Sequence, residues 1–127
     1  MRITVTSVAI NGPCLYVEFT CNQGTSQGTW KTGVPRLGQT YDVELNFQQP
    51  LEMGENLRAA ADESPRVSRS ADGITLVARV EDIFEEGTAS LRLGEALILI
   101  EYQGEFPAPG TWVEISLPEL ELWDTGC

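Results

Sequence analysis

The sequence contains no histidine and only three cysteines, so much of the usual chemistry of enzymes and metal sites has few residues available. Without histidine there is no Ser-His-Asp or Cys-His catalytic arrangement, no histidine base and no zinc site that includes histidine. Residues 24–31 hold glycines and a lysine but lack the adjacent Gly-Lys of a phosphate-binding loop. We therefore expect a protein that is not an enzyme and that uses no cofactor and no metal.

The three cysteines form no Cys-x-x-Cys pair. Cys14 and Cys21 stand at the two ends of a segment with the pattern of one extended strand, so they lie about 20 Å apart, beyond the reach of a disulfide. With Cys127 as the odd member, all three are expected to be free thiols in a reducing compartment. The sequence also lacks a run of about 18 apolar residues and a secretory signal at its N-terminus. These features predict a cytoplasmic protein that does not bind membranes.

The charge is strongly acidic and unevenly placed. The net charge is −11; residues 1–80 hold eight acidic and seven basic residues, whereas residues 81–127 hold eleven acidic residues and a single basic one, Arg92. A field of this sign repels nucleic acid and anionic membranes, which bind through lysine and arginine. It favours a basic protein partner, although solubility alone is a competing explanation.

Alternation of apolar and polar residues dominates the chain and predicts strands. The expected strands cover residues 2–10, 14–20, 40–47, 66–70, 74–82, 88–93, 95–102, 111–117 and 119–123. Turn signals at Asn11-Gly12-Pro13 and Asp72-Gly73 predict two antiparallel hairpins. Residues 21–28 have the composition of a polar loop, and residues 53–62 have the spacing of one short helix.

These elements predict an all-β fold in a single domain, residues 1–127. About eight strands with at most one short helix are typical of a small Greek-key barrel, OB-like or similar, with a β-sandwich as the alternative. In residues 95–102, Ile98 and Ile100 alternate with Leu97 and Leu99, so that strand is expected to be buried on both faces.

The acidic last third supplies the candidate binding site. If the apolar residues of 111–117 and 119–123 point inward, the residues between them point outward and place carboxylates beside tryptophans. Such a surface attracts a basic protein and anchors it through aromatic area. The expected partner-binding residues are Trp112, Glu114, Glu119, Glu121, Trp123 and Asp124, with Glu81, Asp82, Glu85 and Glu86 around a turn. The alternative is an edge strand whose charges and Pro118 only prevent aggregation.

Other interpretations of these residues have less support. The run from Glu81 to Gly87 lacks the alternating acids and central glycine of an EF-hand calcium loop. A pair of carboxylates suffices for a glycosidase, but the sequence singles out no pair. Aromatic residues in a basic groove would suit single-stranded nucleic acid, yet Trp112 and Trp123 lie among acids.

Several segments are similar to small acidic bacterial immunity proteins, which neutralise toxins, and to a recurring type of small bacterial all-β protein. They are YDVEL (41–45), DGITL (72–76), LRLG (91–94), ILIE (98–101) and GTWVEI (110–115), within residues 40–123. The resemblance consists of strand patterns and turns and carries over no catalytic residue. It implies a stoichiometric inhibitor of a toxin or effector with a basic surface.

Three functions therefore stand side by side. The first is a protein-binding module of inhibitor or immunity type with a basic partner. The second is a structural or assembly subunit that associates through its strand edges, and the third is an enzyme that works through carboxylates. The sequence leaves the partner, the binding face and the oligomeric state open.

Overall fold

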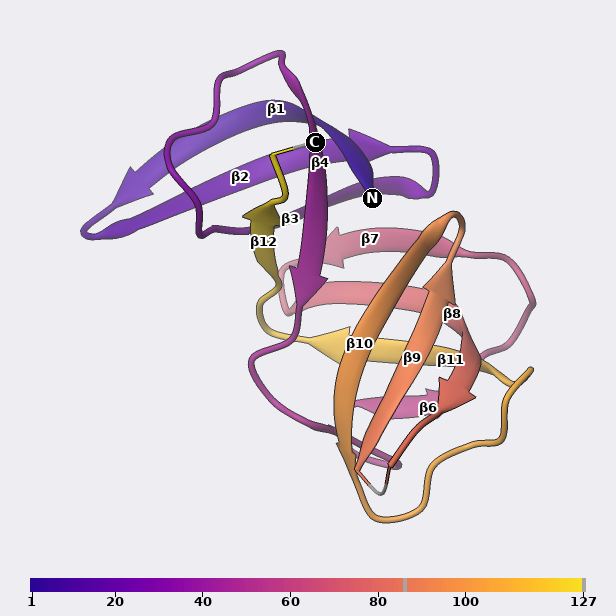
Figure 1. The fold of residues 1–127 in the computed structure, drawn as a ribbon. Coiled ribbons are helices and arrows are strands. Elements are labelled where there is room, and N and C mark those ends of the chain that lie inside the picture. The colour runs from indigo at the N-terminus through magenta and orange to yellow at the C-terminus, as the bar shows by residue number, and fades with distance from the viewer. Residues whose placement is uncertain (86, 127) are drawn as a thin grey trace.

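The computed structural model describes residues 1–85 and 87–126, and this part of the chain is built from strands without a helix (Figure 1). The strands are β1 (Arg2–Asn11), β2 (Cys14–Cys21), β3 (Gly24–Trp30), β4 (Thr40–Asn46), β5 (Leu51–Glu52), β6 (Leu57–Ala59), β7 (Arg66–Ser70), β8 (Gly73–Ile83), β9 (Thr88–Leu93), β10 (Ala96–Gln103), β11 (Trp112–Leu117) and β12 (Glu121–Asp124). The all-β prediction is confirmed.

Five of these strands close into a barrel. β1, β2 and β3 form an antiparallel meander, and β4 pairs antiparallel with β1. β12, the last strand of the chain, pairs antiparallel with β4 and parallel with β3, which completes the ring β1-β2-β3-β12-β4. This closed ring is the small OB-like Greek-key barrel that the strand pattern predicts.

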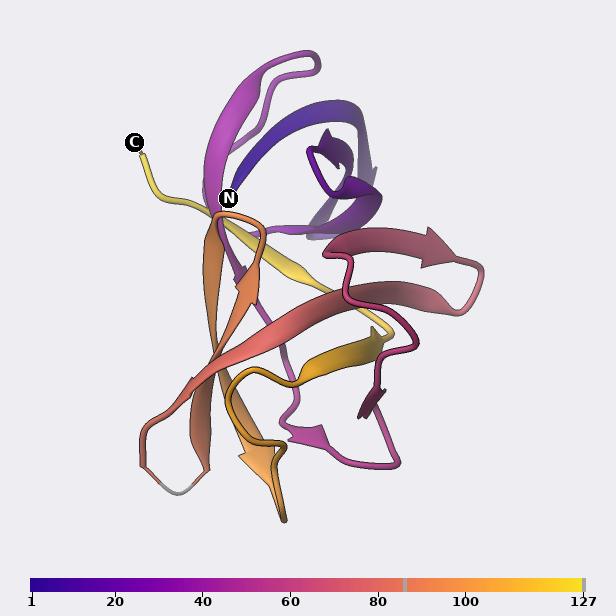
Figure 2. The ribbon, with the colours of Figure 1, turned by 90° about the vertical axis from the view of Figure 1, so that its right-hand side faces the viewer.

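The strands between β4 and β12 lie beside the barrel (Figure 2) and form what we call the second sheet, which joins the barrel where β7 pairs parallel with β3. β8 is its central strand and pairs with β7, β9 and β11; β9 continues into β10, and β11 also pairs with the short β6. β5 adds a short parallel pairing at the end of β10. The chain therefore leaves the barrel after its fourth strand and returns to it only with the last one.

Alternation along the strands places one continuous core inside both parts. The inward residues of the barrel and those of the second sheet belong to the same cluster of buried apolar side chains. Close packing explains Gly28 on β3: a Cβ atom there would lie 2.7 Å from the carbonyl oxygen of Leu120, just before β12. Only glycine lets β12 approach β3 this closely, so Gly28 helps to close the ring.

The predicted helix at residues 53–62 is wrong. The chain forms β5, a turn through Gly54 at a φ of +88° and then β6, whose Leu57 is buried and pairs with Ile115. The Asn56 side chain accepts a hydrogen bond from the Glu52 amide at 2.8 Å and donates one to the Pro50 carbonyl at 3.1 Å. Such side-chain hydrogen bonds compete with the backbone hydrogen bonds of a helix. Pairing of β6 with β11 then stabilises the extended conformation.

The predicted loop at residues 21–28 is also wrong from Gly24 onward, because β3 begins there. Its polar residues obscure the strand pattern, yet Ser26 is buried and donates its hydroxyl to the Ser68 carbonyl at 3.0 Å. The two hairpins predicted from Asn11-Gly12-Pro13 and Asp72-Gly73 are confirmed as β1–β2 and β7–β8. Cys14 and Cys21 are free at opposite ends of β2, and Cys127 lies outside the described residues.

The prediction that β10 is buried on both faces is wrong. Ile98 and Ile100 face the core, but Leu97 is 50% exposed and Leu99 is 67% exposed, because no layer of the fold covers the outer face of β10. The sequence pattern of a doubly buried strand therefore belongs here to a strand with an exposed apolar face.

We expect Leu122→Ala and Leu99→Ala, which are the same chemical change, to differ sharply in stability. Leu122 is fully buried where β12 closes the barrel, so its truncation leaves a cavity and lowers the free energy of unfolding by about 2–5 kcal/mol. Leu99 is largely exposed, so its truncation changes that free energy by no more than about 0.5 kcal/mol. Urea denaturation of the two variants measures both values, and equal losses would contradict the assigned burial.

Candidate functional site

The structure divides the sequence-predicted site residues between the two parts of the fold. Glu81, Asp82 and Glu85 lie on β8 and the turn after it, with Trp112 and Glu114 on the neighbouring β11. Glu119, Glu121, Trp123 and Asp124 lie on β12 or just before it, in the barrel. Glu86 lies outside the described residues.

Arginines pair with two carboxylates of the first group, Glu81 and Glu114. Glu81 accepts ion pairs from Arg79 at 3.0 Å and Arg92 at 3.5 Å, and these pairs lower the pKa of Glu81, the hydrogen bond from Arg92 most. Glu114 pairs with Arg58 of β6 across the sheet. Trp112 pairs in the ladder with Arg79, so it is next to a cation rather than within an acidic field.

The second group lies on a long groove. Three adjoining clefts of about 920, 470 and 300 Å³ run between β4 with β12 on one side and β10 on the other. Asn46 and Leu99 line both the first and the second cleft, and Glu44, Leu45 and Leu97 line both the second and the third, so the clefts are continuous. We call them together the acidic groove. Its outward-facing lining residues are Asp42, Glu44, Asn46, Phe84, Leu97, Leu99, Glu101, Glu121 and Trp123.

Apolar side chains form a strip along this groove. The described residues include eight large apolar side chains that are exposed, and four of them line the groove: Phe84 (56%), Leu97 (50%), Leu99 (67%) and Trp123 (42%). Strand alternation exposes Leu97, Leu99 and Trp123, because their neighbours Ile98, Ile100 and Leu122 face the core, and Phe84 follows the end of β8. Gathered apolar exposure of this kind marks surfaces that bind something else.

Carboxylates border the strip on both sides. Glu101 is on β10, and Asp42, Glu44 and Glu121 face it from β4 and β12. Within the described part of the chain, no ion-pair or hydrogen-bond partner reaches the side chains of Glu44 and Glu101, so both carry uncompensated charge.

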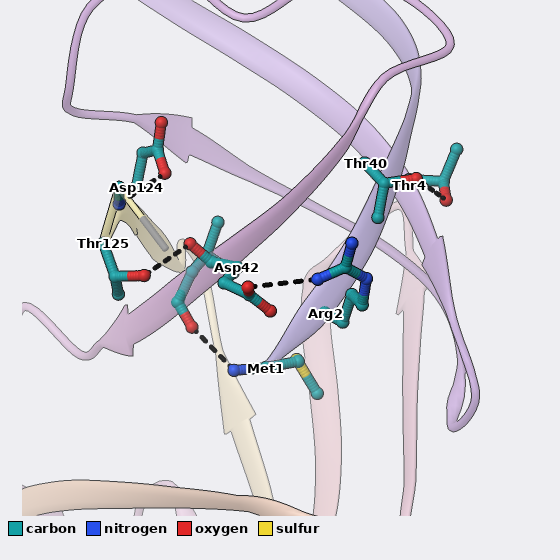
Figure 3. A network of polar contacts seen from close by, with 9 residues as sticks. Met1, Arg2, Thr4, Thr40, Asp42, Asp124 and Thr125 are labelled. Atoms are coloured by element: carbon teal, nitrogen blue, oxygen red, sulfur yellow. Dashed lines mark hydrogen bonds and ion pairs between the residues drawn. The ribbon is translucent and has the colours of Figure 1, made fainter.

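The end of the groove near the N-terminus is held by a polar network (Figure 3). Arg2 pairs with Asp42 at 3.1 Å, the Met1 amino group donates to the Val43 carbonyl at 2.9 Å, and the Thr125 hydroxyl donates to the Asp42 carbonyl at 3.1 Å. These bonds attach both ends of the described chain to β4, so contacts within the chain hold this wall of the groove in place.

Glu121 is the charged group built most firmly into the groove. Its carboxylate accepts hydrogen bonds from Asn46 at 2.9 Å and Gln48 at 3.0 Å, with Lys31 at 3.8 Å. The Asn46 hydrogen bond is the largest cause that lowers the pKa of Glu121, and Gln48, Trp123 and Lys31 contribute less. Glu121 is therefore ionised at neutral pH.

The groove also contains an unpaired strand edge. β10 pairs with β9 along one edge, but on its other edge only Tyr102 and Gln103 pair with β5, which leaves residues 96–101 without a neighbour in the described sheet. β4 lies across the groove, but β12 occupies one of its edges and β1 the other as far as Asp42. Residues 96–101 carry no lysine and no proline, the usual protection of an edge strand.

Sequence reasoning found Glu121, Trp123 and Asp124 at or next to the groove but missed Glu44, Phe84, Leu97, Leu99 and Glu101. The signal was present in part. Leu97 and Leu99 stand out as apolar residues on the second face of a strand, which fits either a doubly buried strand or an exposed apolar edge. Nothing in the sequence shows that β4 is opposite them.

Among residues 1–85 and 87–126, no three cysteine or acidic side chains gather as a metal site would require, and no helix has the length and apolar character needed to cross a membrane. Comparison with protein-family models, curated proteins and solved structures finds no match to the chain.

We expect Asn46→Ala to raise the pKa of Glu121 toward its usual value, because the largest stabilising hydrogen bond to the carboxylate is removed. A lowered pKa means that ionised Glu121 stabilises the fold above its unfolded pKa and that this stability is lost as the pH falls through the folded pKa. The stability difference between wild type and Asn46→Ala should therefore shrink in acid. NMR titration of the Glu121 carboxyl carbon measures the pKa.

Lys31→Ala is the matched control, because Lys31 contributes least of these groups. It should shift the Glu121 pKa less than Asn46→Ala does. An unchanged pKa in Asn46→Ala would show that the hydrogen bond does not hold the carboxylate in the groove.

Proposed function

We propose that this chain is a non-enzymatic protein-binding module that captures a basic protein in the acidic groove. One observation carries the proposal: an apolar strip along an unpaired strand edge lies between Glu44 and Glu101, two carboxylates that have no cation of their own within the described residues. Apolar area gives a partner its binding energy, and unpaired charge selects the sign of that partner.

The electrostatics of the whole molecule support the same partner class. With a net charge of −11, the protein attracts cationic surfaces from a distance and speeds their encounter. The same field opposes nucleic acid and anionic lipid. Both bind proteins through lysine and arginine, which displace the counterions of the phosphates. A basic protein is the macromolecule that this surface fits.

An inhibitor or immunity protein is the form of this function that the sequence resemblance suggests. Such a protein forms a stoichiometric complex with a basic toxin or effector and blocks the active site or binding surface through which that toxin acts. Two features suit this role: the groove is held in shape by the polar network at Asp42, and its recognition needs no residue with catalytic chemistry. A rigid, preformed site binds tightly because few loops and side chains lose conformational entropy on association.

Assembly through strand edges is the second candidate, and the unpaired edge of β10 is the observation that favours it. Two copies would bring two such edges together, but each copy carries a net charge of −11 and a groove bordered by the same carboxylates. Like charges brought together at an interface oppose pairing, so a basic partner is the better match.

We expect the double variant Glu44→Lys with Glu101→Lys to bind the native partner at least about tenfold more weakly, because unpaired groove charges then repel a cation instead of attracting it. The association rate should fall, and its dependence on salt should become shallower. The partner is isolated from the source cells on the tagged chain, and surface plasmon resonance at several salt concentrations measures both rates.

The control double variant is Glu63→Lys with Glu105→Lys. Both residues are exposed and line none of the three clefts, and the net charge changes by the same amount. This control should keep its affinity to within about threefold, because charges outside the groove make no contact with the bound partner and are screened by salt. Equal losses in the two double variants would show that total charge, rather than the acidic groove, recruits the partner.

A further inference from the structure

The geometry points to a specific binding mode: the partner inserts an extended segment of alternating basic and apolar residues, which pairs with β10 as an added strand. This inference rests on the proposed function and specifies the partner's chemistry at the same groove. Strand addition takes its affinity from main-chain hydrogen bonds and its specificity from alternate side chains.

The backbone of β10 is oriented for such an addition. Gly94 and Glu95 form a two-residue hairpin loop, with Gly94 at a φ of +60°, between the paired residues Leu93 and Ala96. In a two-residue hairpin the flanking pair is hydrogen-bonded, and the bonded pairs then alternate along an antiparallel ladder. Ala96, Ile98 and Ile100 therefore bond to β9, while the N–H and C=O groups of Leu97 and Leu99 point away from it, into the groove.

Two further contacts agree with this assignment. The Tyr102 amide donates to the Gly87 carbonyl at 2.9 Å, on the side of β9, which continues the alternation of the even-numbered residues. Beyond Glu101 the opposite edge is already used, because β5 pairs with Tyr102 and Gln103 there. The chain itself thus pairs with the end of this edge and leaves the part before it open.

The groove is lined by the edge of β10 rather than by one of its two faces. Consecutive residues 96–98 line the third cleft and 99–101 line the first, so side chains from both faces of β10 border the same space. An added strand would place its side chains alternately on these two faces. The open stretch of six residues between the hairpin loop and β5 sets its length at about 20 Å.

The two faces select different side chains. On the outer face, the exposed Leu97 and Leu99 lie between the carboxylates of Glu44 and Glu101, with the Trp123 ring on the opposite wall. Arginine or lysine fits here, because its aliphatic stem covers leucine while its head reaches a carboxylate or an aromatic ring. On the inner face, Ile98 and Ile100 favour a β-branched apolar residue.

A foreign segment fits this edge better than a second copy of the chain. In β10 the outer-face residues are leucines and Glu101, and no residue from 96 to 101 is basic. A second β10 would bring its own carboxylate to a groove already bordered by Asp42, Glu44, Glu101 and Glu121. An alternating basic segment instead neutralises Glu44 and Glu101, the two groove carboxylates without an ion pair in the described part of the chain.

The test uses a synthetic peptide, acetyl-Arg-Val-Arg-Val-Arg-Val-amide, and a peptide of the same composition in blocks, acetyl-Arg-Arg-Arg-Val-Val-Val-amide. We expect the alternating peptide to bind at least about tenfold more tightly, because only alternation satisfies both faces along a strand. Isothermal titration measures the affinities, and NMR follows the amides of Leu97 and Leu99, which should shift and become protected. Equal binding of the two peptides would overturn strand addition.

Methylation of the peptide backbone tests the hydrogen bonds directly. The N–H groups of successive residues in a strand point to opposite sides, so the three arginines and the three valines aim theirs in opposite directions. N-methylation of one set should abolish binding, and N-methylation of the other should change it less than about threefold. If neither set matters, or if both matter equally, the peptide does not pair with β10.

A matched pair of protein variants tests the same bonds from the other side. The Leu99 N–H donates no hydrogen bond to β9. Leu99→Pro therefore removes a donor that faces the groove, while the hydrogen bonds between β9 and β10 remain. Proline is tolerated at such edge positions. Leu99→Ala removes only the side chain. Leu99→Pro should bind the alternating peptide at least about tenfold more weakly than Leu99→Ala. Circular dichroism checks that both fold, and if Leu99→Pro does not, the methylated peptides decide.

The outcomes separate this inference from the proposed function. Suppose that the alternating peptide binds the wild type, binds the variant Glu44→Lys with Glu101→Lys more weakly, and keeps its affinity when its backbone is methylated. The acidic groove is then confirmed as the binding site, and strand addition is overturned. If the peptide binds and neither groove variant weakens it, both are overturned. Self-association of the chain with protection of Leu97 and Leu99, measured by sedimentation and NMR, would assign the edge to a second copy.

Discussion

A β-strand has only two edges that can form hydrogen bonds, and this limit governs the structure around β4. β12 pairs along one edge of β4 to close the barrel, and β1 pairs along the other as far as Asp42. β10, which comes from the inserted sheet, lies across the groove from β4 and forms no ladder with it. Barrel closure therefore occupies one edge of β4, whereas the edge of β10 that borders the groove stays open.

The open edge places apolar side chains in water, and the charge distribution offsets the resulting tendency to aggregate. Leu97 and Leu99 add little to the core, since at least half of each residue is exposed. Carboxylates on both sides of them keep copies of the protein apart through mutual repulsion. Under the proposed function, the same charges select a cationic partner, so one set of residues opposes self-association and sets the specificity.

The acidic residues do not act as one group, although they crowd the last third of the sequence. Glu81 and Glu114 are compensated by arginines of β8, β9 and β6, so they contribute cross-strand pairs within the second sheet. Glu44 precedes that acidic third and yet faces the groove with its charge uncompensated. A count of charges along the chain is therefore a poor guide to the field at a site, because pairing across strands decides which charges remain free.

Local patterns in the sequence determined most of the strands, both early hairpins and the all-β class, because alternation and turn residues act over a few neighbours. They also placed Trp123 and Glu121 outward on the closing strand. Tertiary structure alone decided three matters: that residues 57–59 pair with β11 where a helix was predicted, that Leu97 and Leu99 are exposed, and that β4 lies opposite them. Each depends on which distant segments meet. A leucine on the second face of a strand has the same local pattern whether another layer covers it or water does.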